Sequence, residues 1–242
     1  MAGLEQRRIA DLDCLVYTTT RPPELLLILC HGFGAPGDDL VPLGAHLLRM
    51  QPELLDRVQI VFPAALLDLA EIGMPRSRAW WMLDMEKLQR AMQLGEFRDM
   101  RNENPPGLTK ARESLERVIA ALQQESGLDW SHTVLGGFSQ GAMLTTDVTL
   151  HAPENPAGLL IWSGTLLCEE QWREIAPRRA GLPIIQSHGR QDSILPFKAA
   201  EWLRDLLSDA GTKNEFLSFN GPHTIPQEAI ERSAELLLDL LD

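Results

Sequence analysis

The sequence is poor in cysteine: Cys14, Cys30 and Cys168 are the three examples in 242 residues. The count is odd and no C-x-x-C occurs, which argues against both a disulfide framework and a zinc ribbon. A reducing compartment fits this cysteine usage best. Cys30 ends an apolar run, so we expect it to pack in the core rather than serve as a reactive thiol.

Clusters of basic residues and long hydrophobic segments are also lacking. The net charge of −12 repels phosphate backbones, which excludes nucleic acid as a partner. The longest apolar run, residues 25–30, is far too short to span a bilayer, and residues 1–13 lack the apolar core of a secretory signal. We therefore expect a soluble cytoplasmic protein with no integral membrane segment.

Short apolar runs alternate with longer helical patterns along the chain, which predicts a single α/β domain over residues 1–242. Helical periodicity covers residues 111–122, 199–210 and 230–241. The apolar runs predict a mostly parallel central sheet with helices on both faces. Buried strands are expected at residues 25–32, 58–63, 132–138, 158–164 and 183–189, with a further strand at 215–220 and an N-terminal edge strand at 14–19.

Residues 64–107 interrupt this alternation. The segment contains several prolines and methionines and the pair Trp80-Trp81. Connections of this length are usually functional or disordered, and the tryptophans disfavour disorder. We predict a cap or pocket wall with a short helix near 85–94. Two interpretations of the tryptophans stay open: both anchor the segment on the sheet, or one of them lines a substrate pocket together with Met82.

The stretch GGFSQGAML, residues 136–144, places Ser139 between Gly137 and Gly141. A G-x-S-x-G pattern alone is weak, because it arises by chance in many chains. Here a predicted strand precedes the serine and a predicted helix follows it, which is the context that a nucleophile elbow requires. We therefore interpret Ser139 as a nucleophile in preference to a structural serine in a glycine-rich turn.

A nucleophilic serine needs a base, and an acid to orient that base. His223 lies in the loop NGPHTIP after the last predicted strand, whereas His151 falls at the far end of a helix and His188 directly ends a strand. Asp192, in SHGRQDSILP, follows a strand and precedes His223, the chain order of α/β-hydrolases. The other aspartates between the serine and His223 are interpreted as solvated charges within helices: Asp147, Asp205 and Asp209.

Two backbone N–H groups are needed to stabilise the oxyanion of an acyl-transfer intermediate. We expect one from Gln140, directly after the serine, and the other from Phe33 in the loop HGFG, residues 31–34. His31 is interpreted as a structural residue that bonds this loop. Asp38 or Asp39 is expected to cap the helix that follows.

Five motifs in order, HGFGAPGDD, RAWW, GGFSQGAM, HGRQDSILP and GPHTIP, resemble the phospholipase/carboxylesterase family of α/β-hydrolases, which includes bacterial carboxylesterases and acyl-protein thioesterases. The resemblance spans residues 25–226. It implies the α/β-hydrolase fold, a triad of Ser139, Asp192 and His223, and oxyanion donors at Phe33 and Gln140. Pro222, which precedes the histidine, and the long 64–107 segment depart from the family's pattern and put the substrate specificity in doubt.

The activity implied is hydrolysis of carboxylic esters, thioesters or lysophospholipids through an acyl-enzyme, with a small-molecule substrate and no cofactor. No H-E-x-x-H motif or cluster of metal-ligating residues is visible, so no metal is expected. The family often forms dimers, which leaves a homodimer open. The alternative function is a non-catalytic α/β-hydrolase scaffold that binds a small molecule.

Overall fold

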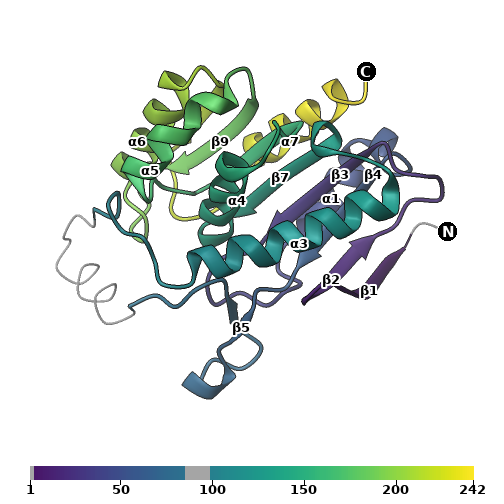
Figure 1. Ribbon diagram of the computed structural model, residues 1–242, viewed down its shortest axis with the longest axis horizontal. Helices are drawn as coiled ribbons and strands as arrows, with labels where there is room; N and C mark the ends of the chain where they lie inside the picture. Colours follow the sequence, from purple (N-terminus) through teal and green to yellow (C-terminus); the bar gives the residue numbers. More distant parts are fainter. Residues whose placement is uncertain (1–2, 85–98) are drawn as a thin grey trace.

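The computed structural model describes residues 3–84 and 99–242 (Figure 1). Within these ranges the chain forms an eight-stranded sheet with the order β1-β2-β4-β3-β7-β8-β9-β10. β1 and β2 pair antiparallel, as do β2 and β4, whereas every other pair in this sheet is parallel. The strands are β1 (Leu4–Ile9), β2 (Leu12–Tyr17), β3 (Leu25–Cys30), β4 (Val58–Pro63), β7 (Thr133–Phe138), β8 (Gly158–Trp162), β9 (Pro183–Gly189) and β10 (Lys213–Phe219).

Continuous apolar runs become the buried strands, as predicted. All six residues of β3 are buried, because the sheet is covered on both faces. The prediction of an N-terminal edge strand at residues 14–19 is wrong. This segment falls in β2, which pairs with β1 on one side and with β4 on the other, and β1 forms this edge of the sheet. β1 reads LEQRRI and is mostly exposed, so the chain offers no apolar run that would reveal it.

Helices cover both faces of the sheet (Figure 1). One core cluster joins Leu26 and Ile28 of β3 to four helices, and a second joins Leu25 and Leu27 to the remaining two. The first face carries α3 (Leu108–Ser126), α4 (Gln140–His151), α5 (Glu169–Ile175) and α6 (Phe197–Asp209), and the second carries α1 (Val41–Met50) and α7 (Gln227–Asp239). The described residues also form four short 3-10 helices: η1 (Pro52–Leu54), η2 (Ala70–Ile72), η3 (Trp130–His132) and η4 (Ala176–Arg179).

The cap expected for α1 is wrong. Leu40 precedes the helix, and no side chain makes a capping hydrogen bond there. The backbone carbonyl of Asp38, rather than a carboxylate, accepts from the N–H of Val41. A proline in the first turn has no N–H to be capped, which lowers the need for such a side chain.

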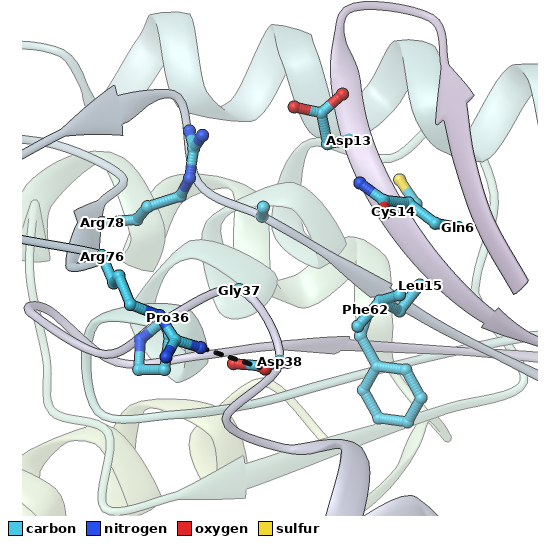
Figure 2. Close-up of a pocket in the computed structure, with 11 residues that line it drawn as sticks. Gln6, Asp13, Cys14, Leu15, Pro36, Gly37, Asp38, Phe62, Arg76 and Arg78 are labelled. Carbon is cyan, nitrogen blue, oxygen red and sulfur yellow. Dashed lines mark ion pairs between the residues drawn. The ribbon is translucent and has the colours of Figure 1, made fainter. Parts of the chain in front are cut away.

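The described part of the 64–107 segment forms a small hairpin of β5 (Leu67–Asp68) and β6 (Arg78–Ala79), which projects beyond the main sheet (Figure 1). The helix predicted near 85–94 lies outside the described residues. A recess of about 370 Å³ lies beside this hairpin. Arg76, Arg78 and Asp13 are among the residues that line it (Figure 2). Arg76 pairs with Asp38 at 3.9 Å on its exposed rim.

The three cysteines are free and buried. Burial raises the pKa of Cys14 to about 12 and that of Cys168 to about 11, and it raises the pKa of Cys30 well above its ordinary value. All three thiols are therefore protonated at neutral pH, in agreement with a packing role for Cys30.

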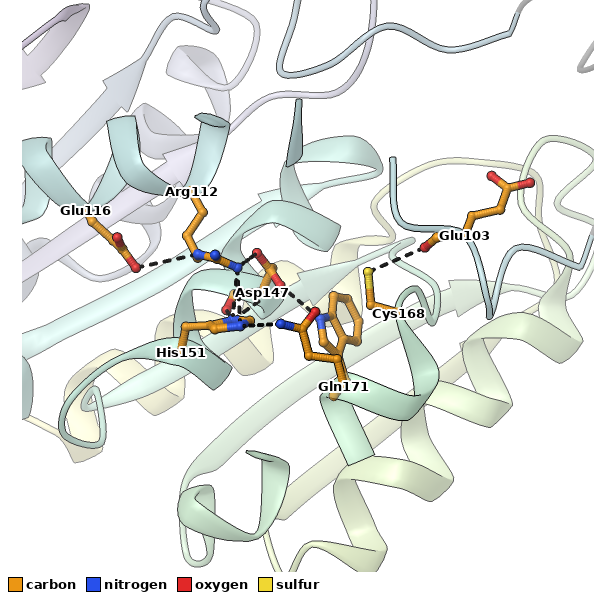
Figure 3. Close-up of polar contacts among 8 residues, drawn as sticks. Glu103, Arg112, Glu116, Asp147, His151, Cys168 and Gln171 are labelled. Atoms are coloured by element: carbon orange, nitrogen blue, oxygen red, sulfur yellow. Dashed lines mark hydrogen bonds and ion pairs between the residues drawn. The ribbon is translucent and has the colours of Figure 1, made fainter. Parts of the chain in front are cut away.

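Asp147 lies inside the molecule, so its interpretation as a solvated charge is wrong (Figure 3). Its Oδ2 accepts from Arg112 of α3 at 2.9 Å, and its Oδ1 accepts from the indole N–H of Trp172 of α5 at 2.9 Å. The physical reason is that every residue of α4 from 140 to 150 is buried, so this helix has no solvated face for a charge.

His151, the last residue of α4, belongs to the same cluster and is partly buried instead of lying on the surface. Its Nδ1 lies 2.8 Å from the carbonyl oxygen of Asp147 and 3.4 Å from the Asp147 carboxylate. Arg112 of α3 and Gln171 of α5 contact its ring, and Glu116 of α3 pairs with Arg112 (Figure 3). The hydrogen bond to Asp147 raises the pKa of His151 and outweighs both burial and the repulsion from Arg112.

A group whose pKa is raised by folding stabilises the protein below its unfolded pKa, here about 6.5. That contribution is lost as the pH rises through the raised folded pKa. We expect His151→Gln to lower the free energy of unfolding most in acid, and progressively less as urea unfolding is repeated from about pH 5.5 to about pH 9.

The matched control is His132→Gln, because His132 pairs with Asp129 while half exposed, where solvent screens the pair. This variant should lower the free energy of unfolding less than His151→Gln does. A His151→Gln deficit that is constant with pH, or that grows toward alkaline pH, would contradict the assignment.

Candidate active site

Ser139 occupies the sharp turn between β7 and α4. Its φ of 55° and ψ of −117° lie in a region that residues with a Cβ rarely adopt, so the turn stores strain. Two hydrogen bonds hold it: the Ser139 N–H donates to the carbonyl of Trp162 at 2.9 Å, and the Ser139 carbonyl accepts from the N–H of Met143 at 3.1 Å. The side chain is thereby fixed at the carboxyl end of the parallel strands.

The two glycines of the motif are required by packing. A Cβ on Gly137 would lie 2.4 Å from the carbonyl carbon of Gly141, and a Cβ on Gly141 would lie 2.0 Å from the carbonyl oxygen of Cys30. Real Cβ atoms do not approach backbone this closely. The spacing G-x-S-x-G therefore records how tightly α4 is seated against β7 and β3.

Asp192 and His223 come together from the loops that follow β9 and β10. The Nδ1 of His223 lies 2.6 Å from Oδ2 of Asp192. The other carboxylate oxygen, Oδ1, accepts from the backbone N–H groups of Ile194 at 2.9 Å and Leu195 at 2.8 Å. Burial raises the pKa of Asp192, but hydrogen bonds from His188 and His223 outweigh it and hold the pKa well below its usual range. The carboxylate is therefore ionised.

Ser139 and His223 open into one cavity of about 310 Å³. The ring of His223 lies 4.7 Å from that of Phe138, the residue before the serine. Among the described residues that line the cavity, Asp39 and His223 are the acidic or basic ones, and most of the described wall is apolar. The lining residues are Gly32, Phe33, Ala35, Asp39, Met74, Leu83, Met100, Phe138, Ser139, Gln140, Met143, Ile194, Leu195 and His223.

The loop after β3 borders the nucleophile directly. A Cβ on Gly32 would lie 3.4 Å from the Cβ of Ser139, which brings Phe33 to the cavity wall. His31 fixes this loop, because its ring lies 2.8 Å from the carbonyl of Gly32 and accepts from the N–H of Ala65 at 3.1 Å. Burial lowers the pKa of His31 to about 4, so the ring is neutral, as its predicted structural role requires.

Gln140 is the first residue of α4, so its N–H has no acceptor within the helix. The backbone groups of Phe33 and Gln140 thus border the cavity from two sides. The side chain of Gln140 also binds the backbone of the tryptophan pair, which the sequence did not reveal. Its Oε1 accepts from the N–H of Trp80 at 2.9 Å and its Nε2 donates to the carbonyl of Trp81 at 2.8 Å.

Trp80 and Trp81 lie away from the wall of this cavity. Each is 1% exposed, and both belong to the core cluster on the α3 face. Trp80 also donates from its indole N–H to the carbonyl of His31 at 2.9 Å. Met82 is 46% exposed and, like the tryptophans, is not among the described residues that line the cavity. This placement favours the anchoring interpretation of the pair.

Sequence reasoning missed most of the apolar wall. Met74, Leu83 and Met100 come from the described ends of the 64–107 segment, so that segment supplies cavity wall. Trp81 and Met82 line another recess, which shares Leu83 and Met100 with this cavity, and a role for them in substrate binding stays a prediction. Met143 lies inside GGFSQGAM, one helical turn after Ser139, and this position could have identified it as a wall residue.

Ser163 supports the loop that carries His223. The structure places Ser163 Oγ 3.1 Å from the carbonyl of Thr224.

Among residues 3–84 and 99–242, no three histidine, cysteine or acidic side chains are grouped to hold a metal ion. Within the same ranges, no helix has the length and apolar character needed to cross a membrane.

Comparison with known proteins places this geometry in context. The Phospholipase/Carboxylesterase family model matches residues 13–239. Acyl-protein thioesterase 1 of Eremothecium gossypii is 29% identical over 230 residues, which cover 92% of this chain and 90% of the relative. Acyl-protein thioesterase 1 of Emericella nidulans is 26% identical over 219 residues, which cover 89% of this chain and 88% of the relative.

Solved structures agree with the sequence comparison. The crystal structure of esterase PE8 superposes with a TM-score of 0.78 at 26% identity and covers 93% of this chain and 97% of its own. A carboxylesterase from Mesorhizobium loti, 16% identical, shares the fold with a TM-score of 0.74 over 97% of this chain and 98% of its own. With the family model matching nearly the whole sequence, the chain belongs to the phospholipase/carboxylesterase family of α/β-hydrolases.

Proposed function

We propose that the protein is a cofactor-free serine hydrolase that cleaves carboxylic esters or thioesters through an acyl-enzyme. The observation that carries the proposal is the 2.6 Å contact between Asp192 and His223, whose ring lines one apolar cavity together with the strained Ser139. Similarity to an esterase of known structure and to acyl-protein thioesterases supports the same reaction class.

In the first half-reaction, His223 removes the proton from the Ser139 hydroxyl as its oxygen attacks the substrate carbonyl. Asp192 occupies Nδ1 of His223, so Nε2 is the nitrogen that takes this proton. The ionised carboxylate stabilises the imidazolium that results. His223 then returns the proton to the leaving alcohol or thiol, and the acyl group stays on Ser139.

The backbone N–H groups of Phe33 and Gln140 are proposed to stabilise the negative charge on the carbonyl oxygen in each tetrahedral intermediate. Water then attacks the acyl-enzyme with His223 as general base, and the carboxylic acid leaves. The apolar wall suits the hydrocarbon part of an acyl chain, because each buried methylene contributes about 0.8 kcal/mol.

A cytoplasmic location and a homodimer belong to the same proposal. Three free, buried thiols fit a reducing compartment. The dimer is expected from the family and is tested by sedimentation equilibrium.

Ser139→Ala should leave a folded protein and lower kcat for a p-nitrophenyl ester by at least about 10³, because the nucleophile is gone. A fluorophosphonate probe should label the wild type and not the variant, which also separates a hydrolase from a non-catalytic binding protein. Ser131→Ala, at an exposed serine in η3, is the control and should be labelled normally. Retention of more than about a tenth of wild-type kcat in Ser139→Ala would sink the proposal.

Asp192→Asn should lower kcat by about 10³ to 10⁴, because the amide cannot hold His223 in the required tautomer or stabilise its charged form. Asp205→Asn is the matched change on the exposed face of α6, where Asp205 pairs with its neighbour Arg204. Its kcat should be nearly that of the wild type. Equal kinetics in the two variants, or the reverse order, would show that the acid is misassigned.

Met74→Trp should shift the preference toward short acyl chains, because an indole fills part of the 310 Å³ cavity. If it displaces two methylenes at about 0.8 kcal/mol each, the octanoyl-to-acetyl ratio of kcat/KM falls about tenfold. Ile72→Trp is the control, since Ile72 lies on the same hairpin, is 55% exposed and does not line the cavity. An unchanged ratio in a stable Met74→Trp protein would remove this residue from the acyl site.

A further inference from the structure

His188, the penultimate residue of β9, lies directly behind Asp192. Both side chains are completely buried. The Nε2 of His188 is 2.8 Å from the carbonyl oxygen of Leu195 and 3.2 Å from Oδ2 of Asp192. Both of these atoms are acceptors, so Nε2 must carry a hydrogen that is shared between them.

The other ring nitrogen, Nδ1, is buried and has no hydrogen-bond partner among the residues that the structure describes. A proton there would be a buried donor without an acceptor, which is costly, whereas an unpaired nitrogen lone pair costs less. His188 is therefore assigned as the neutral imidazole with its hydrogen on Nε2.

Four donors converge on the carboxylate of Asp192, and they divide into two kinds. Oδ1 is held by the backbone amides of its own loop, at Ile194 and Leu195. Oδ2 is held only by imidazoles among the described residues, at 2.6 Å from His223 and at 3.2 Å from His188. His188 is thus the second imidazole partner of the oxygen that binds Nδ1 of His223.

We propose that His188 is a positioning residue, which holds Oδ2 of Asp192 toward His223 and reduces the charge that this oxygen presents to the imidazole. The inference rests on the proposed serine-hydrolase function. Leu195 contacts both residues: its carbonyl orients the His188 ring, and its N–H binds Oδ1 of Asp192. His188 touches no substrate, because it does not line the cavity.

Loss of the hydrogen-bond donor of His188 should change the pH dependence of kcat/KM. A carboxylate with one hydrogen bond fewer carries more charge toward His223 and stabilises its protonated form more strongly. The acidic limb of kcat/KM then moves to higher pH. Among the described residues, the other charged groups near this cluster are Asp39, which lines the cavity with His223, and Arg190. The guanidinium of Arg190 lies 5.2 Å from the ring of Phe197, which is a ring neighbour of His188. Both are unchanged in the variants below.

The test compares His188→Met, which fills similar space without a donor, with His188→Gln, whose amide can place an N–H near the position of Nε2. In His188→Met, kcat for an ester should fall about tenfold, the size expected for one hydrogen bond to a charged group, with KM little changed. The acidic limb of kcat/KM should move to higher pH. His188→Gln should restore most of both properties.

A purely structural role predicts a different result: equal loss in both variants, with an unmoved acidic limb. That result, or wild-type kinetics in His188→Met, would overturn the inference. Wild-type turnover and fluorophosphonate labelling are measured in parallel, so that failure of the proposed function is recognised separately by an inactive, unlabelled wild type.

A second measurement needs no variant and so does not depend on the folding of one. Nitrogen-15 spectra of histidine-labelled wild type should show His188 as the neutral Nε2–H tautomer at neutral pH. Observation of the Nδ1–H tautomer, or of a doubly protonated ring, would contradict the inference.

Discussion

The contact between Gly141 and the carbonyl oxygen of Cys30 is the constraint on which the site depends. It leaves no room for a Cβ, so the first turn of α4 sits directly on the carboxyl end of β3. That seating brings Ser139 beside Gly32 and places Gln140 on the wall of the same cavity as Phe33. The strained φ of Ser139 is maintained because α4 behind it is buried over its whole length, and such strain persists only where the surroundings over-determine it.

The sequence predicts most of the sheet, because a strand that is buried on both faces must be apolar throughout, and such runs are visible without any knowledge of pairing. It cannot predict β1, whose single partner lets its polar side chains face water. The candidate triad is predictable for another reason. Chain order and placement after strands restrict the choice to few residues, and the carboxyl ends of parallel strands meet at one edge. The roles assigned to Ser139, Asp192 and His223 stay predictions, which the kinetics of the variants test.

The sequence could not predict which side chains contact one another from different helices and loops. Asp147 falls in a helical pattern where an aspartate is normally solvated, and the arginine and indole that make its burial tolerable come from two other helices. The tryptophan pair is similar. Two adjacent tryptophans fit a pocket wall as well as an anchor. The observation that favours an anchor is a contact from Gln140, which binds the backbone of both tryptophans from 59 and 60 residues away along the chain. His188 was set aside as a base because it ends a strand, and the same position places it behind Asp192.

Burial of the three cysteines has a practical consequence for how the protein can be observed. Native thiols that stay protonated and out of reach of solvent do not react with a disulfide indicator such as dithionitrobenzoate. The coloured signal released during thioester turnover therefore comes from product alone. When the chain unfolds, the same indicator titrates the thiols that the core had hidden. One reagent thus reports both turnover and the integrity of the fold, in the same cuvette and without a label.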